Sequence, residues 1–231
     1  GAVLGFKVDY RNTIISDLLE EEIPDQAYEE KEHMLEVLDA ILNKSQQQLN
    51  IPKGVGKSYE AILTVKSIPR AQAYYNLLKS ILAGKERVKV SKRVKRHLPD
   101  FPKFTITYSV SENEEESIGY QDHMKQVMED YNQEFGTHFS IADLRGFNSD
   151  INNRLARKQD KYLYRNEQLD LVIVVDRLLT GFDAPCLSTL FIDRKPMRPQ
   201  DLIQAFSRTN RIFDDKKHFG HIITFQRPQA F

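Results

Sequence analysis

The chain has 231 residues with 33 basic and 33 acidic side chains, so its formal charges balance at pH 7. This balance excludes a general attraction to nucleic acid or membranes and leaves such contacts to local patches. One cysteine excludes an internal disulfide, and no run of about 18 apolar residues is present to span a bilayer. The N-terminus lacks a methionine and a signal peptide, which predicts a cytoplasmic piece of a longer protein, without membrane contact.

The first 58 residues predict a helical linking segment. Residues 6–10 alternate weakly between apolar and polar side chains, which fits either a strand or an extended arm. Between residues 27 and 49 the apolar side chains recur with the period of an amphipathic helix. We interpret this helix as a packing element that bridges to a preceding domain, and we expect the main domain to occupy residues 59–231.

A Gly-Lys-Ser sequence at residues 56–58 resembles the end of a phosphate-binding P-loop. The complete P-loop pattern requires another glycine five residues before Gly56, but Ile51 stands there. It also requires a strand before the loop and a helix after it, whereas here a helix precedes and a strand candidate follows. We therefore predict a solvated basic turn instead of a nucleotide site.

The remainder of the chain alternates strand and helix patterns. Five short apolar runs predict strands at residues 61–65, 104–108, 171–175, 189–192 and 221–225, and helices are expected at 71–82, 120–135 and 151–157. This alternation is typical of the α/β class, with a parallel sheet covered by helices on both faces. Ligands of such sheets gather at the carboxyl ends of the strands.

The lone Cys186 is expected to be a small buried side chain.

A run of basic residues at 85–97 interrupts this pattern. Such a run is usually a solvated surface loop. On a protein that binds nucleic acid, the same run can contact phosphates, which would make binding sensitive to salt. The sequence leaves both interpretations open.

The most informative stretch runs from Asp170 to Arg211. A β-branched strand is followed by the turn TGFDAP at 180–185, a second strand, and the sequence QAFSRTNR at 204–211. If residues 199–207 are helical, Gln204 and Arg208 share one face and Arg211 lies a turn further along. This arrangement predicts a clamp for an anion. The structural alternative is that both arginines pair with carboxylates at a helix end.

These motifs resemble the fifth and sixth motifs of superfamily 2 helicases and translocases. The wording LLTGFDAP followed by QAFSRTNR is closer still to the motor (R) subunit of type I restriction enzymes. The resemblance covers residues 167–225 strongly, extends plausibly back to about residue 61, and is weak before that point. It implies a second RecA-like lobe that helps to move along duplex DNA with energy from ATP, in an enzyme that then cleaves the DNA at a distance.

The resemblance also assigns roles to single residues. Arg208 and Arg211 match the fingers that stabilise the charge on the γ-phosphate of ATP during its transfer. The nucleotide-binding residues that the resemblance implies are Gly181, Asp183 and Gln204. Those implied at the DNA are Ser67, Arg70 and Thr180. For Ser67 and Arg70, a helix-start serine and a surface arginine fit the sequence equally well.

The resemblance also implies cofactors, further domains and partner subunits that lie outside this chain. Its ATP and Mg²⁺ bind mainly to an upstream RecA-like lobe, and a nuclease domain precedes that lobe in the same chain. Its partners are double-stranded DNA and the modification and specificity subunits. We therefore expect this chain alone to be inactive. Two alternatives remain: another superfamily 2 translocase or helicase lobe without a restriction role, and a non-catalytic Rossmann-like binding domain with structural arginines.

Overall fold

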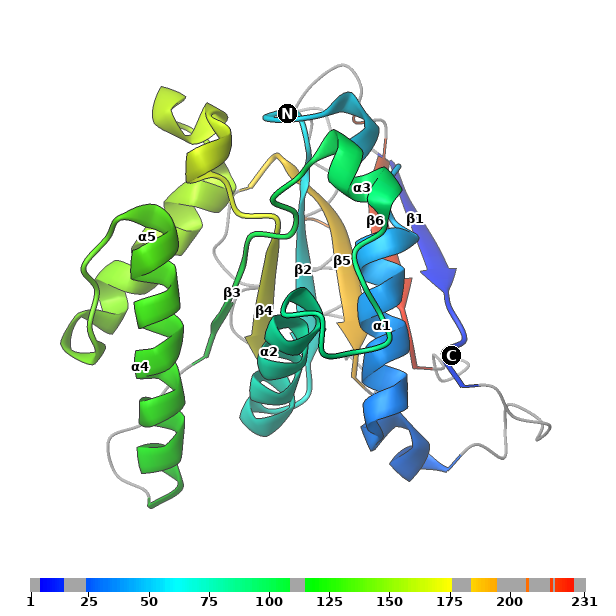
Figure 1. The fold of residues 1–231 in the computed structure, drawn as a ribbon, viewed down its shortest axis with the longest axis horizontal. Coiled ribbons are helices and arrows are strands. Elements are labelled where there is room, and N and C mark those ends of the chain that lie inside the picture. The colour runs from blue at the N-terminus through cyan, green and yellow to red at the C-terminus, as the bar shows by residue number, and fades with distance from the viewer. Residues whose placement is uncertain are drawn as a thin grey trace.

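A computed structural model describes residues 5–14, 24–108, 115–175, 184–194, 207, 217 and 219–226. Six strands form one sheet in the order β1-β6-β5-β2-β4-β3, and every neighbouring pair is parallel. All strands therefore end along the same edge, which is the lower edge in Figure 1. This arrangement confirms the predicted α/β class with a RecA-like parallel sheet.

The centre of the sheet consists of β5 (Leu187–Asp193), β2 (Glu60–Val65) and β4 (Leu171–Val175). Every residue of β2 and β5 is buried, as expected for strands covered on both faces. The outer strands are β3 (Phe104–Thr107), β6 (Phe219–Thr224) and β1 (Gly5–Tyr10). All five predicted strands are confirmed, and β1 shows that residues 6–10 form a strand and not an extended arm.

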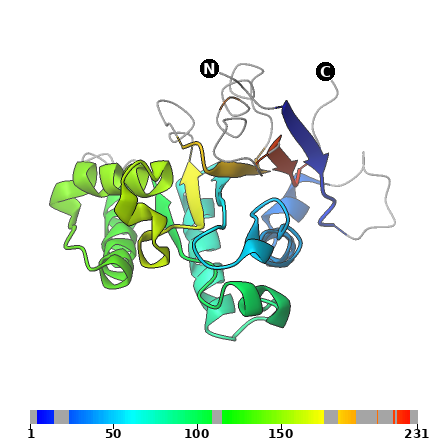
Figure 2. The same cartoon turned by 90° about the horizontal axis from the view of Figure 1, so that it is seen from above.

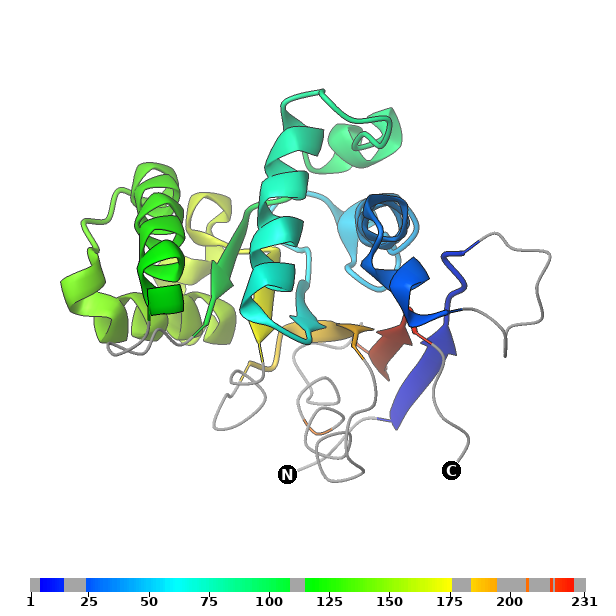
Figure 3. The ribbon, with the colours of Figure 1, turned by 90° about the horizontal axis from the view of Figure 1, so that it is seen from below.

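The helices occupy two places beside the sheet. Figures 2 and 3 show α1 (Lys31–Asn43), α2 (Ile68–Leu82) and α3 (Lys92–His97) on one face. Helices α4 (Glu115–Phe135) and α5 (Leu144–Ala156) lie together beyond the β3 edge. In the part of the chain that the structure describes, no helix combines the length and apolar character needed to cross a bilayer.

Short 3-10 helices connect these elements. They are η2 (Asp25–Glu29), η3 (Ile51–Lys53), η4 (Ile141–Asp143), η5 (Asp160–Leu163) and η6 (Arg165–Glu167). The amphipathic pattern over 27–49 therefore yields a shorter helix than predicted, because the chain turns after Asn43 and Asn50 adopts a left-handed conformation with φ of 54°. The basic run is also not entirely a loop, since α3 lies within it.

The N-terminal residues share the body of the domain. β1 pairs with β6 over six residues, from Gly5 opposite Phe219 to Tyr10 opposite Thr224. Helix α1 buries one side in the same core as the central strands, through residues such as Leu38 and Leu42. The segment predicted to link two domains is thus packed into the same sheet and core as the residues that follow it.

Candidate functional site at the carboxyl edge of the sheet

Three strands end side by side at the middle of the carboxyl edge. Val65 of β2 lies opposite Val175 of β4 on one side and opposite Asp193 of β5 on the other. The chain segments that leave these three ends carry the residues that the sequence singled out. These segments therefore leave the sheet at neighbouring positions. Parallel sheets commonly bind their ligands at this carboxyl edge.

Most of the predicted site lies outside the described residues. This applies to the turn with Thr180, Gly181 and Asp183 and to the helix with Gln204, Arg208 and Arg211. The structure describes Ser207 alone within 199–211, and it is helical. Ser67 and Arg70 are both described, and they lie at the start of α2, directly after β2.

Asp193, the last residue of β5, is fully buried and accepts hydrogen bonds on both carboxylate oxygens. Its Oδ1 accepts from His33 Nε2 at 2.7 Å and from Gln226 Nε2 at 2.9 Å. Its Oδ2 accepts from the Tyr74 hydroxyl at 2.5 Å and from Arg70 Nη2 at 3.3 Å. We call these five residues the Asp193 cluster, and they join α1, α2, β5 and the residues that follow β6.

The cluster holds Asp193 as a carboxylate. Burial alone raises the pKa of Asp193, but the hydrogen bonds from His33 and Tyr74 and the charge of Arg70 outweigh it, so the pKa is lowered. Burial and the neighbouring Asp193 raise the pKa of the Tyr74 phenol well above its usual value, so this hydroxyl remains a donor. Because a carboxylate only accepts, His33 Nε2 must carry the proton of its contact.

Ser67 and Arg70 hold the start of α2 in place. The Ser67 side chain caps the helix by accepting from the backbone N–H of Arg70 at 3.3 Å. The Arg70 side chain is 6% exposed, so it is not the surface arginine that the sequence allowed. Its guanidinium donates to the carbonyl oxygens of Tyr28 and Glu29 as well as to Asp193. The contact of Arg70 with DNA stays a prediction.

The Asp193 cluster was not predicted from the sequence. The available signal was a carboxylate at the end of a buried apolar strand, at the edge where ligands gather. Its partners are spread from residue 33 to residue 226, and only the fold brings them together. The cluster fixes the position from which the chain leaves β5 toward the predicted arginine helix.

Comparison with known proteins identifies the family. The model for "Type I restriction enzyme subunit R domain 3" matches residues 57–227. The chain belongs to the R-subunit family of type I restriction enzymes. It is 33% identical over 239 residues to the endonuclease subunit of the type I restriction enzyme SsaAORF53P of Staphylococcus saprophyticus. It is also 30% identical over 235 residues to the SauCOLORF180P endonuclease subunit of Staphylococcus aureus.

This R-subunit domain is one part of a larger protein in its relatives. Each of the two alignments covers 98% of the chain but 23% of the relative, so the chain spans about a quarter of their length. Among solved structures, the ATP-dependent Type ISP restriction-modification enzyme LlaBIII bound to DNA aligns with a TM-score of 0.46 and 14% identity. That alignment covers 99% of this chain and 12% of the other.

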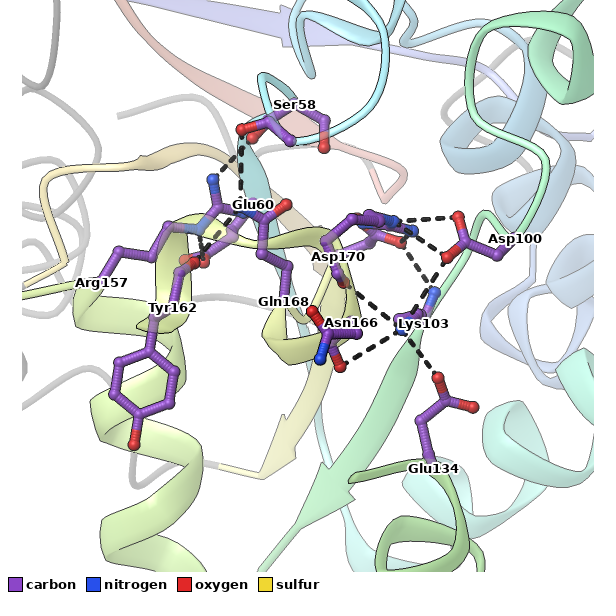
Figure 4. A network of polar contacts seen from close by, with 12 residues as sticks. Ser58, Glu60, Asp100, Lys103, Glu134, Arg157, Tyr162, Asn166, Gln168 and Asp170 are labelled. Atoms are coloured by element: carbon purple, nitrogen blue, oxygen red, sulfur yellow. Dashed lines mark hydrogen bonds and ion pairs between the residues drawn. The ribbon is translucent and has the colours of Figure 1, made fainter. Parts of the chain in front are cut away.

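The opposite, amino edge of the R-subunit domain contains a buried ion pair. Figure 4 shows Glu60, the first residue of β2, with its Oε1 accepting from Arg157 Nε at 2.8 Å. Arg157 also donates from Nη1 to the carbonyl oxygen of Ser58 at 2.8 Å. Burial raises the pKa of Glu60 to about 7, although the charge of Arg157 opposes this shift. Cys186 is buried beside the pair, as predicted.

The Gly-Lys-Ser turn leads directly into this ion pair. Gly54 and Gly56 have φ values of 85° and 79°, which side chains rarely adopt. Strand β2 begins at Glu60, so a strand follows the turn where a P-loop requires a helix. The prediction that this is not a P-loop is therefore confirmed, but Ser58 is buried and not solvated.

A second group of ion pairs holds the starts of β3 and β4. Asp170, which precedes β4, accepts from Arg165 at 2.6 Å and from the backbone N–H of Lys103 at 2.7 Å. Arg165 also pairs with Asp100 at 2.9 Å, and Lys103 pairs with Glu134 of α4 at 2.9 Å. Figure 4 labels Asp100, Lys103, Glu134 and Asp170 of this group beside the Glu60 pair. The amino edge is thus fastened by ion pairs between protein groups.

Replacing Glu60 with glutamine should change how stability depends on pH. Glu60 has a pKa of about 7 in the folded chain, whereas an ordinary glutamate has 4.5, so its protonated form stabilises the fold below the lower value. That contribution is lost as the pH rises to 7, by at most about 1.4 kcal/mol per pH unit. Urea unfolding between pH 5 and 8 should therefore show a smaller loss of stability in Glu60→Gln than in the unmodified chain. Glu32→Gln, which removes an exposed carboxylate, is the control, and parallel curves for Glu60→Gln and the unmodified chain would contradict the prediction.

Proposed function

We propose that this R-subunit domain is the second motor lobe of an ATP-driven translocase for duplex DNA. The observation that carries the proposal is the alignment of Val175, Val65 and Asp193 at the carboxyl edge. Because these three strand ends are adjacent, the turn with Gly181, the start of α2 and the segment that leads to Arg208 all leave the sheet from neighbouring strands. In this proposal the edge faces ATP bound to an upstream RecA-like lobe, together with its Mg²⁺.

The clamp acts on the charge that develops on ATP. Phosphoryl transfer spreads negative charge over the γ-phosphate oxygens, and arginines supplied across an interface stabilise it. Arg208 and Arg211 are assigned this role, because a guanidinium offers two parallel hydrogen bonds and stays charged. Gln204 senses the nucleotide. Gly181 permits close backbone approach, and Asp183 accepts from the ribose hydroxyl or binds an arginine.

The DNA is assigned to the neighbouring part of the same edge. Ser67 lies directly after β2, and Thr180 follows β4, so both leave the sheet at adjacent strands. Their hydroxyl groups suit contact with phosphate oxygens, which fix position without reading sequence. The whole protein would carry a nuclease domain upstream and would work with modification and specificity subunits, one of which recognises the DNA site.

The proposal predicts half an active site in residues 1–231. We expect the full-length parent protein to hydrolyse ATP at a rate that duplex DNA increases, and residues 1–231 alone to show no hydrolysis above buffer. Release of phosphate, measured with and without duplex DNA for both proteins, tests this. Two results would overturn the assignment: ATP hydrolysis by residues 1–231 alone, or a hydrolysis rate of the parent protein that duplex DNA does not increase.

A further inference from the structure

The basic run at residues 85–97 divides into two electrostatically different parts. In the first part, Arg87 donates to Glu32 at 2.8 Å and to Glu36 at 2.7 Å, and both carboxylates lie on α1. Helix α3 forms the second part. Four residues on α3 have exposed cationic side chains that form no hydrogen bond or ion pair with any described residue: Lys92, Arg93, Lys95 and Arg96.

Helix α3 is fixed firmly enough to present these cations in one direction. Val94 is fully buried, and its backbone N–H donates to the capping Ser91 side chain at 3.2 Å. The Ser91 backbone N–H in turn donates to Asn43 Oδ1 at the end of α1, at 2.9 Å. With 100° between successive residues, Lys92 and Arg96 stand together on the side of the helix that faces away from Val94.

The turn before β2 extends the positive surface. A Cβ atom placed on Gly54 would lie 3.8 Å from the carbonyl oxygen of His97, so the turn lies against the end of α3. Lys53 and Lys57 flank this position, and the side-chain ammonium group of neither has a partner among the described residues. Gln168 Nε2 donates to the Gly56 carbonyl oxygen at 3.4 Å, which helps to hold the turn.

These six residues form what we call the α3 basic surface: Lys53, Lys57, Lys92, Arg93, Lys95 and Arg96. The sequence contains no Asp or Glu from 87 to 99 or from 44 to 59. The helix dipole disfavours Lys92 and Arg93 in the first turn but favours Lys95 and Arg96 in the last turn, and Lys92 repels Arg96 one turn away. A bound polyanion would relieve this repulsion between like charges.

We propose that the α3 basic surface binds the phosphate backbone of duplex DNA, as a second contact at the amino edge of the sheet. Figure 1 shows α3 at the edge where the strands begin, opposite the edge assigned to ATP. The inference rests on the proposed function, because DNA is the track of that motor. A protein partner fits less well, since protein interfaces are depleted of lysine and four of the six cations are lysines. Phosphate contacts of this kind give affinity without sequence specificity.

The test uses the full-length parent protein and a duplex DNA labelled with a fluorophore. Binding is measured by anisotropy from 50 to 200 mM salt for the unmodified protein and for Lys92→Gln/Arg96→Gln. Losing two phosphate contacts should lower the slope of log affinity against log salt by roughly 2 and weaken binding about tenfold at the lower salt concentrations. The charge-conserving swap Lys92→Arg/Arg96→Lys should bind like the unmodified protein.

Lys125→Gln/Arg145→Gln is the matched control, because it removes one lysine and one arginine that are exposed on α4 and α5. We expect its affinity and salt slope to be unchanged. If the unmodified protein binds DNA and the α3 variant has the same slope, the α3 proposal is wrong while the proposed function stands. If the unmodified protein does not bind duplex DNA, both fail. An α3 variant that keeps its DNA affinity but loses a partner subunit would reassign the surface to that protein.

Discussion

Replacing Arg208 or Arg211 with alanine in the parent protein should reduce DNA-stimulated ATP hydrolysis by a factor on the order of 10³. The reason is that the positive charge is needed when the γ-phosphate is transferred and contributes less before that step. Nucleotide and DNA affinity should therefore change much less than the turnover rate. Steady-state phosphate release, with separate binding measurements for ATP and duplex DNA, distinguishes the two effects.

Two further variants separate a finger from a structural arginine. Arg208→Lys keeps the charge but loses the planar fork, so it should remain slow. Arg145→Ala removes an exposed arginine of α5 and should hydrolyse ATP like the unmodified protein. If Arg208→Ala and Arg211→Ala both turn over normally while folded, the arginines have a structural role and the motor assignment loses its mechanism.

The strands were predictable because their apolar runs are short and clearly bounded. Strand β4 was predicted with its exact limits, since Leu171–Val175 is entirely aliphatic. Helix α5 was predicted to start at residue 151, but it starts at Leu144. Its first two turns are largely polar and contain Gly146, so periodicity missed them. The Asp143 side chain, which accepts from the Gly146 backbone N–H at 3.0 Å, was the available signal.

The place of the N-terminal residues was not predictable from local pattern. Strand β1 has two polar residues among its last four, Lys7 and Asp9, which suits an edge strand as well as a loop. Its partner β6 lies more than 200 residues later in the chain. The same limit applies to the Asp193 cluster, because His33 lies 160 residues from Asp193. Motifs that lie close together in sequence were visible, whereas sites assembled from distant segments required the fold.

Replacing Asp193 with asparagine should lower the free energy of unfolding by about 3 to 5 kcal/mol, the usual effect of removing one partner of a buried ion pair. The amide is nearly the same size, so the effect comes from charge and hydrogen bonding. Arg70 would lose its buried carboxylate partner and keep only the half-exposed Glu29, at 3.7 Å. The new amide would direct two N–H groups toward donors. Urea unfolding of residues 1–231 at pH 7, followed by circular dichroism, measures the loss.

The comparison that decides the origin of this effect is a double-mutant cycle with Arg70→Met. If the ion pair dominates, the double variant should be more stable than the sum of the two single losses implies, because it leaves no buried charge unpaired. Asp9→Asn, at an exposed position near the end of β1, controls for the loss of a carboxylate and should change stability by less than about 0.5 kcal/mol. A loss of that small size for Asp193→Asn would mean that the cluster does not hold α1 and α2 to β5. Other contacts would then have to fix the position at which the chain leaves β5 toward Arg208.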